Sequence, residues 1–204
     1  FCDYVLKRFP ESIVYNCASA RRRIDFESIN RSAPLWRTDY HYGEPIGYQC
    51  HTYGLNFYLP LTGTGVEKND RFTFRSSLGT SVIYNWKVTD GASSFTEMQS
   101  CQKEFNEVRP YFYEDYYPLT SFEDMTTDEI WLAYQLHRSS DQSGFVVAFR
   151  REKSTDNTIS VKLSGLLPDA NYIVENYDTN ETMVKTGKEL LAGLDLKLSE
   201  PRSS

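Results

Sequence analysis

The sequence lacks a stretch that could cross a membrane. Its 204 residues contain no apolar run of about 18 residues, the length that a bilayer-spanning helix requires, so no membrane partner is expected. It also lacks a start methionine and a recognisable signal peptide. The chain opens at Phe1, inside a stretch that is typical of a helix. We therefore expect the chain to be the C-terminal part of a longer protein.

Basic residues and paired cysteines are also scarce. The 22 lysines and arginines are outnumbered by 28 aspartates and glutamates, which argues against nucleic acid as a partner. Cys2, Cys17, Cys50 and Cys101 form no Cys-x-x-Cys pair, so neither a disulfide framework nor a zinc site is predicted. Gly63-Thr-Gly65 lacks the third glycine of a phosphate-binding loop and is predicted to be a turn. We expect no metal and no cofactor.

The first part of the chain has the helix–strand alternation of a parallel sheet. Pro10 closes a predicted helix, and a short apolar run that reads as a strand follows at once. The predicted elements are a helix over Phe1–Phe9, a strand over Glu11–Tyr15, and helices around Asp25–Arg31, Gln49–Leu59, Ser76–Asn85 and Ser94–Tyr113. The last of these carries apolar residues at steps of three and four.

The second part changes character from about Asp128. Short strands separated by turn residues, with no helical pattern between them, indicate an antiparallel sheet or sandwich. The predicted strands are Trp131–His137, Gly144–Phe149, Thr158–Leu163 and Tyr172–Val174. We therefore divide the chain into a first domain over residues 1–120 and a second over residues 121–204.

Two apolar runs of the first domain end abruptly in polar residues. Ile13-Val-Tyr15 leads into Asn16–Ser19, and Ala33-Pro-Leu-Trp36 leads into Arg37-Thr-Asp39. The carboxyl ends of parallel strands meet at one rim of a sheet or barrel, where active sites are built. The sequence thus predicts a polar site at this rim.

These residues resemble the acid/base region of the microbial α-galactosidases of glycoside hydrolase family 36. The resemblance rests on Asn16-Cys-Ala-Ser19, the following Arg-Arg-Ile-Asp25, and Arg31–Tyr40. It continues in the same order through Gly47–Gly54, Phe74–Gly79, Arg109–Tyr111, Asp115–Leu119, Leu163–Leu166, Asn171–Tyr172 and Gly187–Leu190. Colinear matches over nearly the whole chain make it specific, whereas any one of them alone is weak.

The resemblance implies an α/β fold followed by an all-β domain. Residues 1–120 would form the C-terminal portion of a (β/α)8 barrel, its last strands and helices, and residues 121–204 an antiparallel β-sandwich. A complete barrel needs about 250 residues, so only its final portion fits before the sandwich.

The resemblance also implies an enzyme, a retaining α-galactosidase that hydrolyses terminal α-linked galactose from oligosaccharides. That reaction requires two carboxyl groups about 5–5.5 Å apart. The family's general acid/base falls on Asp39, while Asp25 is the competing carboxylate and is expected to be structural. The family's nucleophile lies upstream in a Lys-x-Asp setting that these residues do not contain. We therefore expect this chain by itself to have no hydrolase activity.

Sugar binding is assigned by the same resemblance to Cys17, Ser19, Trp36 and Arg37. Trp36 would either stack on a sugar face or pack inside the barrel. The family usually has glycines after Cys-x-Ser, whereas this chain has Ala20-Arg21. Added side chains at that turn could narrow the pocket or change its backbone geometry.

Several alternatives stay open from the sequence. The parent protein could be an α-N-acetylgalactosaminidase, a galactosyl-transferring relative, or a catalytically degenerate carbohydrate-binding homologue. A carboxylate at a strand end beside a tryptophan favours a glycosidase, with an α-galactoside oligosaccharide as its partner. The sequence does not determine the sugar, the linkage or whether the protein forms a homo-oligomer. It also does not determine whether the protein lies in the bacterial cytoplasm, in the periplasm or outside the cell.

Overall fold

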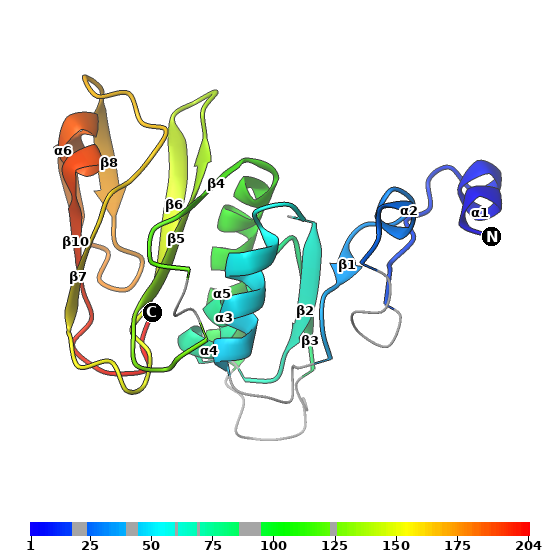
Figure 1. The fold of residues 1–204 in the computed structure, drawn as a ribbon, viewed down its shortest axis with the longest axis horizontal. Coiled ribbons are helices and arrows are strands. Elements are labelled where there is room, and N and C mark those ends of the chain that lie inside the picture. The colour runs from blue at the N-terminus through cyan, green and yellow to red at the C-terminus, as the bar shows by residue number, and fades with distance from the viewer. Residues whose placement is uncertain (18–23, 40–44, 60, 69, 86–94, 123–125) are drawn as a thin grey trace. The chain divides into compact units, whose positions relative to one another are not determined.

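The computed structural model describes residues 1–17, 24–39, 45–59, 61–68, 70–85, 95–122 and 126–204. The chain divides into two units, Phe1–Tyr113 and Glu114–Ser204. The second unit begins before the expected boundary at residue 120 because strand β4 (Asp115–Pro118) pairs with strand β5 (Leu132–Arg138). Figure 1 labels these elements.

A parallel sheet forms the centre of the first unit. Strands β1 (Leu35–Trp36), β2 (Thr62–Val66) and β3 (Ser81–Tyr84) are hydrogen-bonded neighbours in chain order. Helix α3 (Pro45–Leu55) connects β1 to β2, and helix α4 (Arg71–Ser76) connects β2 to β3. On the other side of β1, Asn16 forms a parallel bridge with Leu35. This is the helix–strand alternation that the sequence predicted for the first domain.

The remaining helices of the first unit include a long amphipathic one. Helix α5 (Phe95–Val108) and the 3-10 helix η2 (Arg109–Tyr113) confirm the prediction for Ser94–Tyr113. Cys101, Phe105 and Val108, at steps of three and four, are its buried positions. Helices α1 (Cys2–Arg8) and α2 (Phe26–Ile29) precede the sheet. None of the helices in the described part of the chain is long and apolar enough to cross a bilayer.

Three local predictions for the first unit are wrong. Gly63 and Gly65 lie in the buried strand β2, not in a turn. The region predicted as a helix over Ser76–Asn85 contains the end of α4 and strand β3, because its apolar residues pair with β2. No strand forms over Glu11–Tyr15, since only the next residue, Asn16, bridges to β1.

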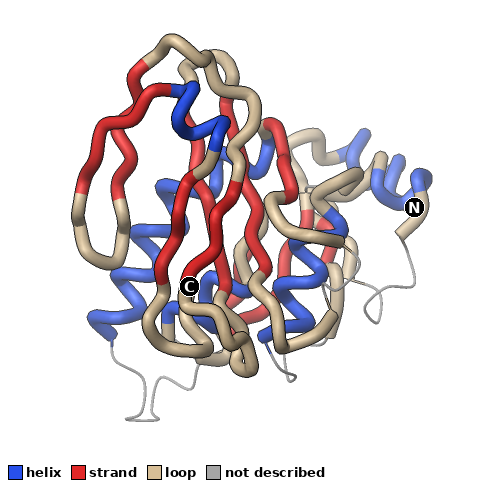
Figure 2. Tube along the Cα trace, turned by 60° about the vertical axis from the view of Figure 1, so that its left-hand side comes forward, coloured by secondary structure: helices blue, strands red, loops and turns tan. Residues whose placement is uncertain are grey.

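The second unit consists of antiparallel sheets. Its strands are drawn as arrows in Figure 1 and in red in Figure 2. One sheet has the order β4-β5-β6, and two further pairs are β7-β10 and β8-β9. The strands not yet bounded are β6 (Ser143–Phe149), β7 (Thr158–Val161), β8 (Asn171–Glu175), β9 (Thr182–Thr186) and β10 (Leu194–Lys197), and helix α6 (Gly187–Ala192) joins β9 to β10. The strands predicted near Trp131, Gly144, Thr158 and Tyr172 are thus confirmed.

One apolar core connects the sheets of the second unit. Ala133 of β5, Val161 of β7, Leu190 of α6 and Leu194 of β10 are buried together. Residues of β8 pack against this cluster as well. Antiparallel sheets that bury their apolar faces against one another are consistent with the predicted β-sandwich.

Candidate functional site

The parallel sheet has two faces with different surroundings. Trp36, Gly63 and Ser81 are register partners on adjacent strands, so their side-chain positions lie on one face. Gly65 lies on the same face, two residues further along β2. We call this the glycine face. We call the opposite side the helix face. Arg37 follows Trp36 directly, so its side chain points to the helix face.

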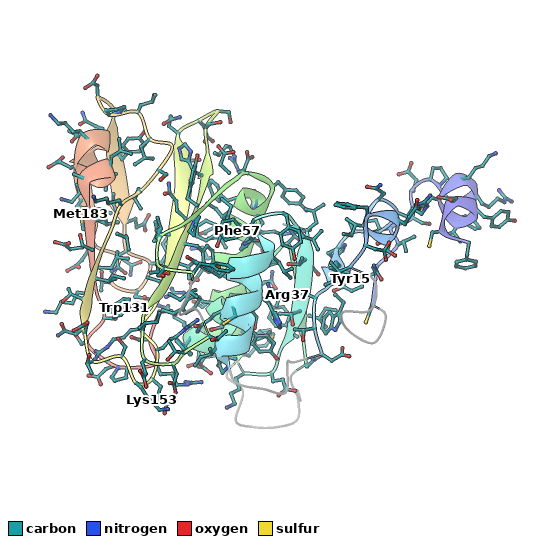
Figure 3. The ribbon with its side chains drawn as sticks, in the orientation of Figure 1. Tyr15, Arg37, Phe57, Trp131, Lys153 and Met183 are labelled. Carbon is teal, nitrogen blue, oxygen red and sulfur yellow. The ribbon has the colours of Figure 1, made fainter. Side chains whose placement is uncertain are left out.

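Arg37 is buried on the helix face. Its side chain is 1% exposed, and its Nη1 donates to the hydroxyl of Thr52 on α3 and to the carbonyl of Leu78. Thr52 donates to the same carbonyl at 2.9 Å. Figure 3 shows Arg37 on the α3 side of the sheet. The prediction that Arg37 contacts a sugar therefore does not fit its placement, because strand alternation turns it away from Trp36.

Trp36 and Asp39 are brought into direct contact. The indole Nε1 of Trp36 donates a hydrogen bond of 2.8 Å to Oδ1 of Asp39. The tryptophan side chain is buried, whereas Asp39 is exposed just beyond the carboxyl end of β1. Asp39 thus has one carboxylate oxygen fixed by a hydrogen bond, while the residue as a whole is exposed to solvent. A carboxyl group in this setting can exchange a proton with a ligand.

Missing side chains on β2 leave room for the aromatic rings of the glycine face. A methyl group on Gly65 would lie 2.6 Å from Nδ2 of Asn85 and 3.4 Å from Cη2 of Trp36. A methyl group on Gly63 would lie 3.1 Å from the hydroxyl of Tyr15. The rings of Tyr15 and Trp36 are in tilted contact, with centroids 6.3 Å apart. At Gly63 the nearest atom is the backbone oxygen of Ser81, at 2.7 Å, so neighbouring atoms leave little room for a side chain at either glycine.

Tyr15 extends across the glycine face toward β3. Burial raises the pKa of Tyr15, and this outweighs the lowering by its hydrogen bond with the side chain of Ser81. The phenol is therefore neutral at neutral pH. Cys17 is an exposed free thiol, and since Asn16 pairs with Leu35, alternation puts Cys17 on the face of Trp36. Ser19 lies outside the described residues, so its predicted role remains a prediction.

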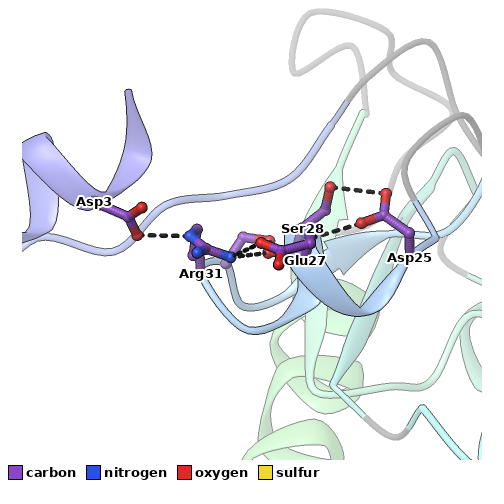
Figure 4. Close-up of polar contacts among 6 residues, drawn as sticks. Asp3, Asp25, Glu27, Ser28 and Arg31 are labelled. Atoms are coloured by element: carbon purple, nitrogen blue, oxygen red, sulfur yellow. Dashed lines mark hydrogen bonds and ion pairs between the residues drawn. The ribbon is translucent and has the colours of Figure 1, made fainter.

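Asp25 caps a helix. Its carboxylate accepts hydrogen bonds from the backbone N–H of Ser28 at 2.9 Å and from the Ser28 hydroxyl at 3.0 Å, at the start of α2. At the other end of α2, Arg31 forms ion pairs with Asp3 and Glu27 (Figure 4). These contacts support the structural role expected for Asp25.

Tyr15, Gly65 and Asn85 were not predicted as parts of this site. Their association depends on the register between strands that lie far apart in the sequence, and no local pattern reveals it. The two glycines carried a signal, since glycine inside a strand often marks a close approach of another group. Among the residues that the structure describes, no three of His, Cys, Asp and Glu cluster as metal ligands.

Comparisons with known proteins point to one class of enzyme. No family model matches the chain. The bifunctional α-galactosidase/sucrose kinase AgaSK of Mediterraneibacter gnavus is 22% identical over 188 residues, which cover 86% of this chain. The α-galactosidase of Lactobacillus brevis has a solved structure that matches 100% of this chain with a TM-score of 0.76 at 16% identity.

The chain is related to α-galactosidases. This confirms the predicted resemblance to the enzymes grouped in glycoside hydrolase family 36. The α-galactosidase-related chain spans 20% of the length of the curated relative and 29% of the chain in the solved structure. The activity of the whole protein is therefore a matter of proposal.

Proposed function

We propose that the chain is the C-terminal part of a retaining α-galactosidase in which Asp39 is the general acid/base. The observation that carries this proposal is the position of Asp39. It follows β1 at the carboxyl end of a parallel sheet, is exposed, and has one carboxylate oxygen fixed by Trp36. Barrel enzymes place their catalytic groups at this end of the strands.

The order of the parallel neighbours supports a barrel segment. Asn16, β1, β2 and β3 follow one another in chain order, and the helices that the structure describes against them lie on the helix face. A (β/α)8 barrel has this order around its wall. Tyr15 and Ile83 on the glycine face are 37% and 41% exposed. Since parallel sheets are normally covered on both faces, preceding strands of a barrel would enclose this face.

The proposed reaction uses Asp39 twice. In the first step Asp39 donates its proton to the glycosidic oxygen while a carboxylate on a preceding segment attacks the anomeric carbon. The sugar is then covalently bound and the alcohol leaves. In the second step the Asp39 carboxylate takes a proton from water, whose oxygen attacks the anomeric carbon and releases the sugar with retained configuration. The preceding segment must place its carboxyl group about 5–5.5 Å from Asp39.

The proposed substrate is a terminal α-linked galactose. The α-galactosidase names of both compared proteins support galactose over its N-acetylated analogue. Residues Ala20 and Arg21, whose side chains were expected to shape the pocket, lie outside the described residues. N-Acetylgalactosamine specificity and galactosyl transfer are therefore outcomes that the experiment must separate.

The test is an assay of the full-length protein on aryl α-galactosides and aryl α-N-acetylgalactosaminides, with NMR detection of the first anomer released. We expect turnover of the galactoside with α-galactose as the first product. The β anomer as first product would contradict retention. Inactivity on both substrates would favour the degenerate homologue instead. Residues 1–204 alone serve as the negative control, because they lack the nucleophile segment.

A further inference from the structure

The side chain of Trp36 is poorly placed for stacking on a sugar. It is 6% exposed, and one side of its ring meets Tyr15. Its far edge lies over Gly65, where Asn85 also packs. A ring enclosed in this way has little free surface to offer a ligand. Its only polar atom, Nε1, is directed at Oδ1 of Asp39.

We propose that Trp36 is a positioning residue that selects which oxygen of Asp39 carries the catalytic proton. This inference rests on the proposed function, since it needs Asp39 to be the general acid/base. An indole N–H can only donate, so the oxygen that faces it must accept in both protonation states of the carboxyl group. The proton of the acid form is therefore held on Oδ2, the oxygen that faces away from the indole.

The hydrogen bond from Trp36 also favours the proton transfer itself. When Oδ2 gives its proton to the leaving oxygen, the carboxyl group becomes a carboxylate and the bond to Oδ1 becomes charge-assisted. Charge-assisted hydrogen bonds are shorter and about twice as strong as neutral ones. The interaction thus strengthens as the leaving group departs, and weakens again when Oδ2 takes a proton from water in the second step.

The packing of the glycine face fixes the direction of the N–H group. The ring of Trp36 contacts the ring of Tyr15, and its Cη2 lies over Gly65 of β2. Contacts from separate segments leave the indole few alternative rotamers. A donor that is fixed before the substrate binds requires no reorganisation during the reaction.

The test uses the full-length protein and substrates that differ in leaving group. Departure of an activated phenol such as dinitrophenol needs little protonation, whereas departure of methanol requires a general acid. Two variants remove the N–H: Trp36→Phe, and replacement of Trp36 by 3-benzothienylalanine, which keeps the shape of the indole. We expect both to lower kcat/KM for methyl α-galactoside by roughly 10- to 100-fold and to change the value for the dinitrophenyl galactoside little.

A matched control removes a similar indole hydrogen bond in the second unit. Trp131 donates from Nε1 to the carbonyl of Asp156 at 2.9 Å, and Figure 3 labels it. Trp131→Phe should reduce stability without any dependence of activity on the leaving group. In an Asp39→Asn background, Trp36→Phe should cause no further loss on methyl α-galactoside, because its partner can no longer act as an acid.

The outcomes separate this inference from the proposed function. If Asp39→Asn itself loses no activity on methyl α-galactoside, the proposed function fails. If Asp39→Asn shows the loss but the benzothienylalanine variant behaves as wild type, or both Trp36 variants lose equally on all leaving groups, the positioning role is wrong. Additive losses in the double variant would also overturn it.

Discussion

The guanidinium of Arg37 donates to the hydroxyl of Thr52, and both groups donate to the carbonyl of Leu78. This buried contact joins β1 to α3 and to the turn after α4. Arg37 follows Trp36 directly and precedes Asp39 by two residues. Its contact on the helix face therefore fixes the backbone that carries both residues of the candidate site. Thr52 and Leu78 lie in segments that resemble the α-galactosidases, and these segments stabilise the site by holding Arg37.

We predict that Arg37→Met lowers the stability of the first unit by roughly 2 kcal/mol, because it removes hydrogen bonds of a buried charged donor. Urea unfolding of the chain measures this. Arg31→Met is the matched control: it breaks partly exposed ion pairs and should cost less than about 1 kcal/mol. If the Arg37 variant has unchanged stability and a raised KM in the full-length protein, this would instead support the prediction that Arg37 contacts the sugar.

The two glycines of β2 should respond differently to alanine. A methyl group on Gly63 would lie 2.7 Å from the backbone oxygen of Ser81, whereas at Gly65 the nearest atom is the side-chain Nδ2 of Asn85 at 2.6 Å. Backbone cannot move away easily, so Gly63→Ala should destabilise by about 1–3 kcal/mol. Gly65→Ala should cost less stability, because the side chain of Asn85 can move away. Thermal unfolding of both variants checks the order, and the reverse order would contradict the packing described.

The ion pair between α4 and α5 should be important for stability. Arg75 donates to both carboxylate oxygens of Glu104, at 2.7 and 2.9 Å, and the two side chains are 8% and 14% exposed. Glu104→Gln removes the carboxylate charge that faces this buried guanidinium and should cost about 3 kcal/mol. Glu107→Gln on the same helix, which breaks an exposed pair with Lys103, should change stability by less than about 0.5 kcal/mol. If chemical denaturation shows equal losses of stability for the two substitutions, the buried ion pair contributes no more than the exposed one and the prediction is wrong.

Helix α6 provides a prediction about pH. Hydrogen bonds from the backbone and the hydroxyl of Thr186 lower the pKa of Glu189 below its ordinary value. A lowered folded-state pKa contributes stability that is present above the ordinary value and is lost as pH falls through the folded-state pKa. Wild type should therefore exceed Glu189→Gln in stability at neutral pH, and the difference should shrink as the pH falls below the ordinary glutamate pKa of about 4.3. Urea midpoints that differ by the same amount at every pH would argue against this linkage.

Local patterns predicted the elements whose signal is contained in one segment. The three- and four-residue steps of Cys101, Phe105 and Val108 determine one buried stripe, and α5 forms there. The short run Trp131–His137, followed by turn residues, likewise predicted β5, whose residues from Leu132 to His137 are all buried. The relationship to α-galactosidases was also visible in colinear motifs.

Properties that depend on register were not predictable. Gly63 and Gly65 have the composition of a turn, but they lie inside β2, where a side chain would meet Ser81 at Gly63 and Asn85 at Gly65. Arg37 was assigned to the sugar site by the resemblance to α-galactosidases. In a strand, adjacent residues point to opposite faces, so the contact with Thr52 could be known only once β1 was placed.

The most direct test of the account compares two carboxylates in the full-length protein. Asp39→Asn should lower kcat/KM for an alkyl α-galactoside by about 10²–10⁴-fold, the usual contribution of a general acid. Asp25→Asn, which alters the cap of α2, should retain activity near that of wild type. Full activity of Asp39→Asn, or a larger loss with Asp25→Asn, would contradict the assignment of Asp39 as the acid/base.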